Sequence, residues 1–257
     1  MSMQTDELTN RIRRLLDRLV ESRRSDKQTR ERVDNAVAAQ AKRLPRKGVL
    51  PALDAAIGKS KKRRKEAVYI LSELADMPGA VERMADWIKD PDPDCRSWII
   101  QNIGAQQIIQ LAPLLNEIIE NDPDDFCRMF AIHAAGTLRS PANLPTLLRL
   151  AAKYRRKQLW SLTVALMNYG LSECRPFLLR VFKDAKVDDG IRVIAAWGLA
   201  KLGNKQAYNY LKKMVYDSDQ ELRAAQAICD INEWRFEWNT DYVKTTRENL
   251  ESAHTAT

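Results

Sequence analysis

An arginine that recurs every 32 residues constrains this chain more than any other feature of its sequence. The series has a tryptophan in its fifth place and a last step of 31 residues: Arg32, Arg64, Arg96, Arg128, Trp160, Arg192 and Arg223. Four residues earlier, an aspartate stands in four of these windows: Asp92, Asp124, Asp188 and Asp219. A fixed period of this length is typical of repeat proteins, so we expect about seven stacked structural units.

Each window contains two helical patterns, as residues 204–231 illustrate. Apolar residues first follow steps of three and four from Ala207 to Val215, and after a polar break they do so again from Leu222 to Ile231. The aspartates stand where their carboxylates can cap the second helix of each pair. Such a pair cannot bury its apolar face alone, whereas stacking buries it. The predicted fold class is all-α: an α-solenoid of about seven helix-pair repeats with a period of 31–32 residues.

The repeated pattern Asp-x-x-apolar-Arg resembles the inner-helix signature of HEAT-like repeats of the bilin-lyase type. It stands at residues 92–96, 188–192 and 219–223, and the resemblance covers roughly residues 26–235. The resemblance implies that the Asp and Arg columns form a ladder along the stack and that the arginine helices line its concave face. Trp160 replaces a ladder arginine, so we expect the ladder to be interrupted there.

The chain is expected to have three parts. Residues 1–25 are predicted to form an amphipathic capping helix, because Leu8, Ile12, Leu15, Leu16 and Leu19 share one helical face. Residues 26–235 form the repeats, and residues 236–257 form a C-terminal cap and tail.

No pattern in the chain indicates catalysis, a cofactor or a metal, so none of these is expected. The four cysteines form no CxxC pair, and there are only two histidines, His133 and His254. HEAT-like enzymes that hydroxylate a protein lysine use His-Glu pairs, and the chain has no His-Glu dipeptide. Nothing singles out a chromophore site of the bilin-lyase kind. Cys95 and Cys127, one period apart, are expected to be equivalent buried residues.

Aromatic residues recur at two and five positions after the arginines, on the side expected to face the concave groove. Large side chains exposed in such a stripe would mark a binding site, and the alternative is that they pack between repeats. The predicted partner-binding groove comprises Tyr69, Trp98, Phe130, His133 and Trp197.

Basic residues are concentrated at the N-terminal end. Residues 1–65 hold 19 Lys or Arg and eight Asp or Glu, a net charge of +11, whereas the remainder holds 23 and 26, a net charge of −3. Two clusters are expected in turns that precede the arginine position, and we call them the two basic turns. They comprise Lys59, Lys61, Lys62, Arg63 and Lys65, and then Arg155, Arg156 and Lys157. They could bind phosphates, bind an acidic protein surface or only be solvated.

The sequence thus favours a non-catalytic scaffold, adaptor or inhibitor that holds a partner protein in its groove. The alternative is a nucleic-acid-binding protein, possibly similar to the HEAT-like DNA glycosylases, that uses the basic N-terminal quarter and the groove aromatics. No apolar run approaches the roughly 18 residues of a membrane span, so no membrane partner is expected and the chain is predicted to be cytoplasmic.

Overall fold

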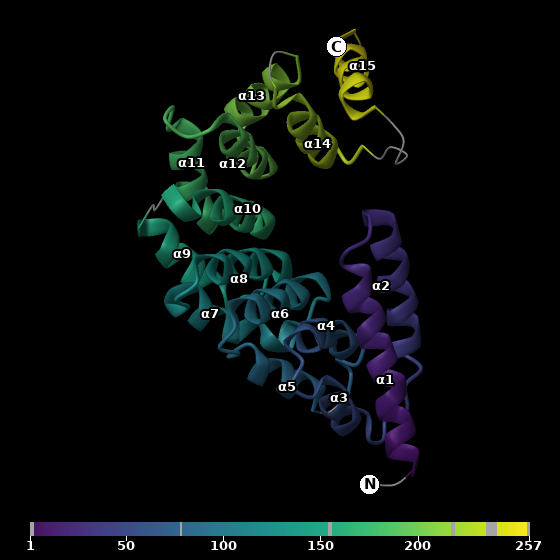
Figure 1. The fold of residues 1–257 in the computed structure, drawn as a ribbon. Coiled ribbons are helices and arrows are strands. Elements are labelled where there is room, and N and C mark those ends of the chain that lie inside the picture. Colours follow the sequence, from purple (N-terminus) through teal and green to yellow (C-terminus); the bar gives the residue numbers. More distant parts are fainter. Residues whose placement is uncertain (1–2, 78, 154–155, 217–218, 235–240, 256–257) are drawn as a thin grey trace. The chain divides into compact units, whose positions relative to one another are not determined.

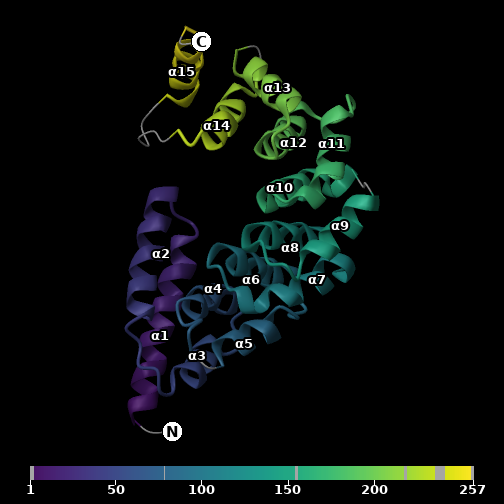
Figure 2. The same ribbon diagram turned by 180° about the vertical axis from the view of Figure 1, so that it is seen from behind.

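The computed structural model of this chain describes residues 3–77, 79–153, 156–216, 219–234 and 241–255. Over these residues the chain forms fifteen α-helices and three short 3₁₀ helices, and it forms no strand. The prediction of an all-α fold built from helix pairs is confirmed. The helices belong to two compact units, residues 1–134 and residues 135–257 (Figures 1 and 2). None of the described helices is both long and apolar enough to cross a membrane.

The first unit stacks consecutive helix pairs, and α8 continues into the second unit. Helix α4 packs against α6, and α1 packs against α2, α3 and α4. The helices of this unit are α1 (Met3–Ser22), α2 (Lys27–Ala41), α3 (Val49–Ile57), α4 (Lys61–Ser72), α5 (Ala80–Trp87), α6 (Pro93–Ala105), η1 (Ile109–Leu111), α7 (Ala112–Asn121) and α8 (Asp125–Leu138).

Capping side chains define where the helices of the first unit begin. Asp26 accepts a hydrogen bond from the backbone N–H of Thr29 at the start of α2, and Asp92 accepts one from Asp94 at the start of α6. Helix α4 begins in the same way, because Ser60 accepts from the backbone N–H of Arg63. These bonds satisfy N–H groups that have no partner inside the helix.

Helix α1 buries the apolar face that its sequence predicts. Ile12, Leu16 and Leu19 have no exposed surface, and Leu15 is 3% exposed. Burial of each such side chain contributes about 1.5–3 kcal/mol. The face therefore fixes α1 firmly against α3 and α4, which places the residues at its C-terminal end beside the start of α4.

The second unit repeats this plan, with α10 packed on α12 and α12 packed on α14. Its last helix packs on α13 and α14, while residues 236–240 of the predicted C-terminal cap lie outside the described residues. Its helices are α9 (Leu144–Lys153), η2 (Arg156–Gln158), α10 (Leu159–Tyr169), η3 (Ser172–Cys174), α11 (Arg175–Lys183), α12 (Asp189–Lys201), α13 (Lys205–Tyr216), α14 (Glu221–Ile231) and α15 (Tyr242–Thr255).

All four cysteines are free and buried, as expected for Cys95 and Cys127. Burial, assisted by neighbouring aspartates, raises the pKa of both of these thiols to about 12, and burial also raises the pKa of Cys174 and Cys229.

Because the thiolate is the reactive form, we expect no rapid reaction of the native protein with a thiol-specific disulfide reagent at pH 8. All four thiols should react once the protein is unfolded in guanidinium chloride. A thiol that reacts rapidly in the native protein would contradict this expectation.

Candidate partner-binding site

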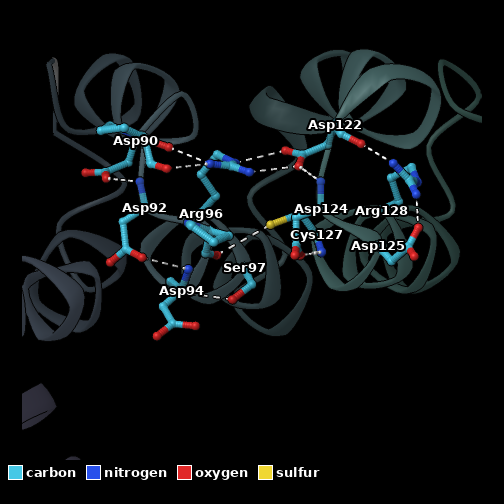
Figure 3. Close-up of polar contacts among 12 residues, drawn as sticks. Asp90, Asp92, Asp94, Arg96, Ser97, Asp122, Asp124, Asp125, Cys127 and Arg128 are labelled. Atoms are coloured by element: carbon cyan, nitrogen blue, oxygen red, sulfur yellow. Dashed lines mark hydrogen bonds and ion pairs between the residues drawn. The ribbon is translucent and has the colours of Figure 1, made fainter.

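Arginines of the first unit connect neighbouring repeats. Arg96 binds Asp122 of the next repeat through two hydrogen bonds, of 2.9 Å from Nε and 2.8 Å from Nη2, and donates a third to the backbone carbonyl of Asp90 (Figure 3). The same step along the stack joins Arg64 to the carboxylate of Asp90 at 2.9 Å. These bonds hold α4, α6 and α8 in register, and so they position the side chains of those helices.

The arginines that follow bond differently. Arg128 forms an ion pair with Asp125 of its own helix and donates to the backbone carbonyl of Asp122 (Figure 3). Arg192 also pairs within its own helix, with Asp189 at 2.8 Å. The ladder implied by the resemblance therefore joins successive repeats at Arg64 and Arg96, whereas Arg128 and Arg192 bond within their own repeats.

Tyr69 of α4 and Trp98 of α6 form an aromatic pair, with ring centroids 5.7 Å apart and planes tilted by 50°. Both side chains are half-buried. The guanidinium of Arg23 lies 5.0 Å from the centroid of Tyr69 and 5.6 Å from that of Trp98, and the ammonium of Lys65 lies 5.5 Å from the ring of Trp98. Cations at these distances are attracted to aromatic rings. The indole N–H of Trp98 is buried and has no acceptor among the described residues.

Arg23 is held in place by two carboxylates. It binds Glu66 of α4 at 2.7 Å and Asp34 of α2 at 3.0 Å. Burial lowers the pKa of Arg23, but the hydrogen bonds to Glu66 and Asp34 outweigh burial and raise it above its usual value. Burial also raises the pKa of Tyr69, with a contribution from the charge of Asp34. Arg23 thus joins α1, α2 and α4 next to the aromatic pair.

These helices enclose an open cleft of about 390 Å³ within the first unit. That volume lies in the range of small-ligand sites, roughly 300–1,000 Å³. The cleft has an aromatic and aliphatic wall, and most of its remaining lining is basic. It is lined by Val20, Arg23, Arg24, Arg30, Lys62, Lys65, Glu66 and Trp98.

The first basic cluster was predicted to lie in a turn, but most of it lies in a helix. Lys61, Lys62, Arg63 and Lys65 belong to the first turns of α4, because Ser60 caps that helix, and only Lys59 precedes it. The charge of Lys61 is paired with Asp92 at 3.0 Å, and that of Arg63 with Asp17 at 2.7 Å. Lys62 and Lys65 line the cleft.

The second basic cluster belongs to the second unit. Arg156 and Lys157 are exposed in η2, directly before Trp160 of α10, which is 44% exposed. Arg155 lies outside the described residues.

The α8 helix presents a second aromatic surface in the first unit. Phe130 and His133 are half-buried, and Phe126 is 65% exposed. Their spacings of four and three residues place the three side chains on one face of the helix. Burial lowers the pKa of His133 below its usual value, which favours the neutral imidazole at pH 7. We call Phe126, Phe130 and His133 the α8 face.

Trp197, the last predicted groove residue, belongs to the second unit. It is half-buried on α12, and its indole N–H donates a 2.7 Å hydrogen bond to Asp230 of α14. Lys201 shares the same carboxylate oxygen at 2.9 Å. The structure thus brings Tyr69 and Trp98 together, shows Phe130 and His133 on one helix of the same unit, and gives Trp197 separate polar partners.

Sequence reasoning missed four residues that contribute to these surfaces. Arg23, Arg24 and Arg30 line the cleft, but they stand around the first repeat, where the pattern is weakest. Phe126 stands two residues before Arg128, a position that the count of groove offsets left out. The spacing of four residues between Phe126 and Phe130 is the sequence feature that places the two rings on one helical face.

Comparisons with known proteins identify the type of repeat. Residues 82–163 match a family model described as HEAT repeats, and residues 191–217 match one described as PBS lyase HEAT-like repeat. No curated protein matches the chain significantly. A solved structure of human deoxyhypusine hydroxylase in complex with glycerol is 13% identical, with a TM-score of 0.35 over 91% of this chain and 99% of that chain. A similarity this low does not bear on activity.

Proposed function

We propose that this chain, a HEAT-like repeat protein, is a non-catalytic scaffold that holds a partner protein against the aromatic side chains of its second helices. HEAT repeats commonly serve as scaffolds for protein interactions. The proposed contacts in the first unit are Tyr69, Trp98 and the α8 face, and Trp197 is the proposed contact in the second unit. The four free cysteines are consistent with a reducing compartment, which we propose is the cytoplasm.

The α8 face carries this proposal. An aromatic side chain as large as Phe126, left 65% exposed, gains little from folding of the free chain. It would gain most on association, because burial of aromatic anchors in a partner is where binding energy concentrates. Phe130 and His133 extend the same face without being fully buried, so the surface offered is larger than a single ring.

The nucleic-acid alternative draws support from the basic lining of the cleft, but the neighbouring repeats oppose it. Among the aspartates at the starts of α6 and α8, Asp94 and Asp124 form no ion pair with the described residues and would repel phosphates. A nucleic-acid strand that bound the cations at the start of α4 would meet these aspartates one and two repeats further along the stack. Continuous phosphate contact along the stack is therefore disfavoured, and the protein-binding function is the better supported one.

Phe126→Ala tests the proposal. The partner is first captured from the native cell with the full chain, and its affinity is then measured for the purified proteins. We expect Phe126→Ala to weaken binding tenfold or more, equivalent to about 1.4 kcal/mol, because an anchoring ring is lost. Its free energy of unfolding should change by less than about 0.5 kcal/mol, since the side chain is exposed.

Ile109→Ala is the matched control, because Ile109 is 49% exposed in the same unit but lies outside the second helices. It should leave both quantities unchanged. Equal binding by wild type and Phe126→Ala, or equal weakening by the two variants, would remove the α8 face from the binding site.

A further inference from the structure

Helix α4 begins with a charge of the unfavourable sign. Its first five residues are all cations: Lys61, Lys62, Arg63, Arg64 and Lys65. The N-terminus of a helix has a partial positive charge, so cations there destabilise the helix and carboxylates stabilise it. Five consecutive cations at a helix N-terminus are unfavourable for folding, which indicates that they serve a function.

Three of these five charges are neutralised inside the first unit. Lys61 pairs with Asp92, Arg63 with Asp17 and Arg64 with Asp90, at distances of 2.7–3.0 Å. Lys62 and Lys65 have no ion pair among the described residues, and both line the cleft.

Two further cations without an ion pair line the same cleft, Arg24 after α1 and Arg30 in α2. The only carboxylate of the lining, Glu66, shares Arg23 with Asp34, so these three side chains together have a net charge of −1. The four cations without an ion pair outweigh it, and the cleft is left with a net positive charge. Like charges that line one cleft repel one another, and a bound anion would relieve the repulsion.

We propose that this cleft binds an acidic segment of the partner protein, with two or more carboxylates placed among Arg24, Arg30, Lys62 and Lys65. The inference rests on the proposed scaffold function and adds the chemistry of the partner. Val20 and the ring of Trp98 give the segment an apolar wall for the stem of an acidic side chain or for a neighbouring apolar residue.

The arrangement of the cations favours a short peptide segment. They surround one cleft, rather than following a face of the stack as the basic stripe of a nucleic-acid site does. Multiple carboxylates on a short segment match this concentrated charge, and complementary charge would also speed its association.

The test measures binding of a fluorescein-labelled peptide of consecutive glutamates to the full chain, by fluorescence anisotropy at low and at physiological salt. A glutamine peptide of equal length and a single-stranded oligonucleotide of equal charge are measured alongside. The variant is Lys62→Gln with Lys65→Gln. The matched control is Lys47→Gln with Lys59→Gln, which removes the same charge from exposed positions outside the cleft.

We expect the glutamate peptide to bind and the glutamine peptide not to bind. The cleft variant should weaken binding of the glutamate peptide tenfold or more, and the control variant less than twofold. Equal weakening by the two variants would overturn the inference, because it would show a response to net charge alone. Tighter binding of the oligonucleotide, lost in the cleft variant, would overturn it in favour of a phosphate site.

Absence of peptide binding at low salt would also overturn the inference. It would leave the scaffold proposal standing, since that proposal depends on the response of the captured partner to Phe126→Ala. If Phe126→Ala bound the captured partner as tightly as wild type while the glutamate peptide still bound the cleft, only the proposed aromatic binding site would be contradicted.

Discussion

Arg96→Ala is expected to lower the free energy of unfolding by about 3–5 kcal/mol, because it leaves a buried carboxylate without its partner. The side chains of Arg96 and Asp122 are only 10% and 6% exposed, and two hydrogen bonds join them. The substitution also leaves the carbonyl of Asp90 without the donor at 2.7 Å. Unfolding in denaturant, followed by the helical circular dichroism signal, measures the effect.

Arg128→Ala is the graded comparison, because the Arg128 pair is more exposed, at 24% and 38% for its two side chains. We expect it to lower stability by about 1–3 kcal/mol. The double variant Arg96→Ala with Asp122→Ala should lose less than the sum of its single changes, since the two side chains interact directly. An Arg96→Ala protein as stable as wild type would show that the ladder bond contributes nothing to the fold.

Gly136→Ala is expected to destabilise the second unit, although alanine is the better helix former by about 1 kcal/mol. A Cβ at Gly136 of α8 would lie 2.5 Å from the Cα and 2.7 Å from the Cβ of Ala165 in α10. Backbone atoms cannot rotate away as the end of a side chain can, so the helices must move apart. Overpacking of this kind costs about 1–3 kcal/mol, and contact with backbone atoms places this case at the upper end of the range. After the gain in helix propensity of about 1 kcal/mol, the net expected loss is about 2 kcal/mol.

Gly104→Ala is the comparison variant for this loss of stability. Its added Cβ would lie 2.9 Å from the Cα of Ala134, a milder approach at the equivalent place one period earlier. We therefore expect a smaller loss of stability for Gly104→Ala than for Gly136→Ala, measured by thermal unfolding. Stabilisation by both substitutions would mean that helix propensity, rather than helix separation, decides the outcome at these glycines.

The fold could be predicted from the sequence because each repeat carries several independent signals. The period located Arg96 and the aspartates that cap the second helices, and Asp92 and Asp188 cap α6 and α12 as expected. The signal weakened where the period slipped to 31 residues. There Gln220, rather than Asp219, stands at the N-cap position of α14.

The binding surfaces were less predictable, because they depend on pairing between distant residues. The count of charges in residues 1–65 could not tell Lys61, neutralised by Asp92, from Lys62, which is not paired. The basic run is predicted in a turn because it precedes the arginine position, whereas Ser60 caps α4 and places most of the run in the first turns of that helix. An ion pair between residues 43 positions apart in the sequence, such as Arg23 and Glu66, cannot be predicted from local periodicity.

The cleft draws on α1, α2, α4 and α6, and this shared construction limits how the chain can change in length. Repeat proteins vary in length by gain and loss of whole repeats, since each repeat contacts only its neighbours. A repeat inserted between α4 and α5 would move Trp98 away from Lys65 and open the aromatic wall. A repeat gained within residues 139–231 would leave the cleft intact. Relatives that keep the cleft should therefore differ in repeat number towards the C-terminal end, with the order of helices from α1 to α6 unbroken.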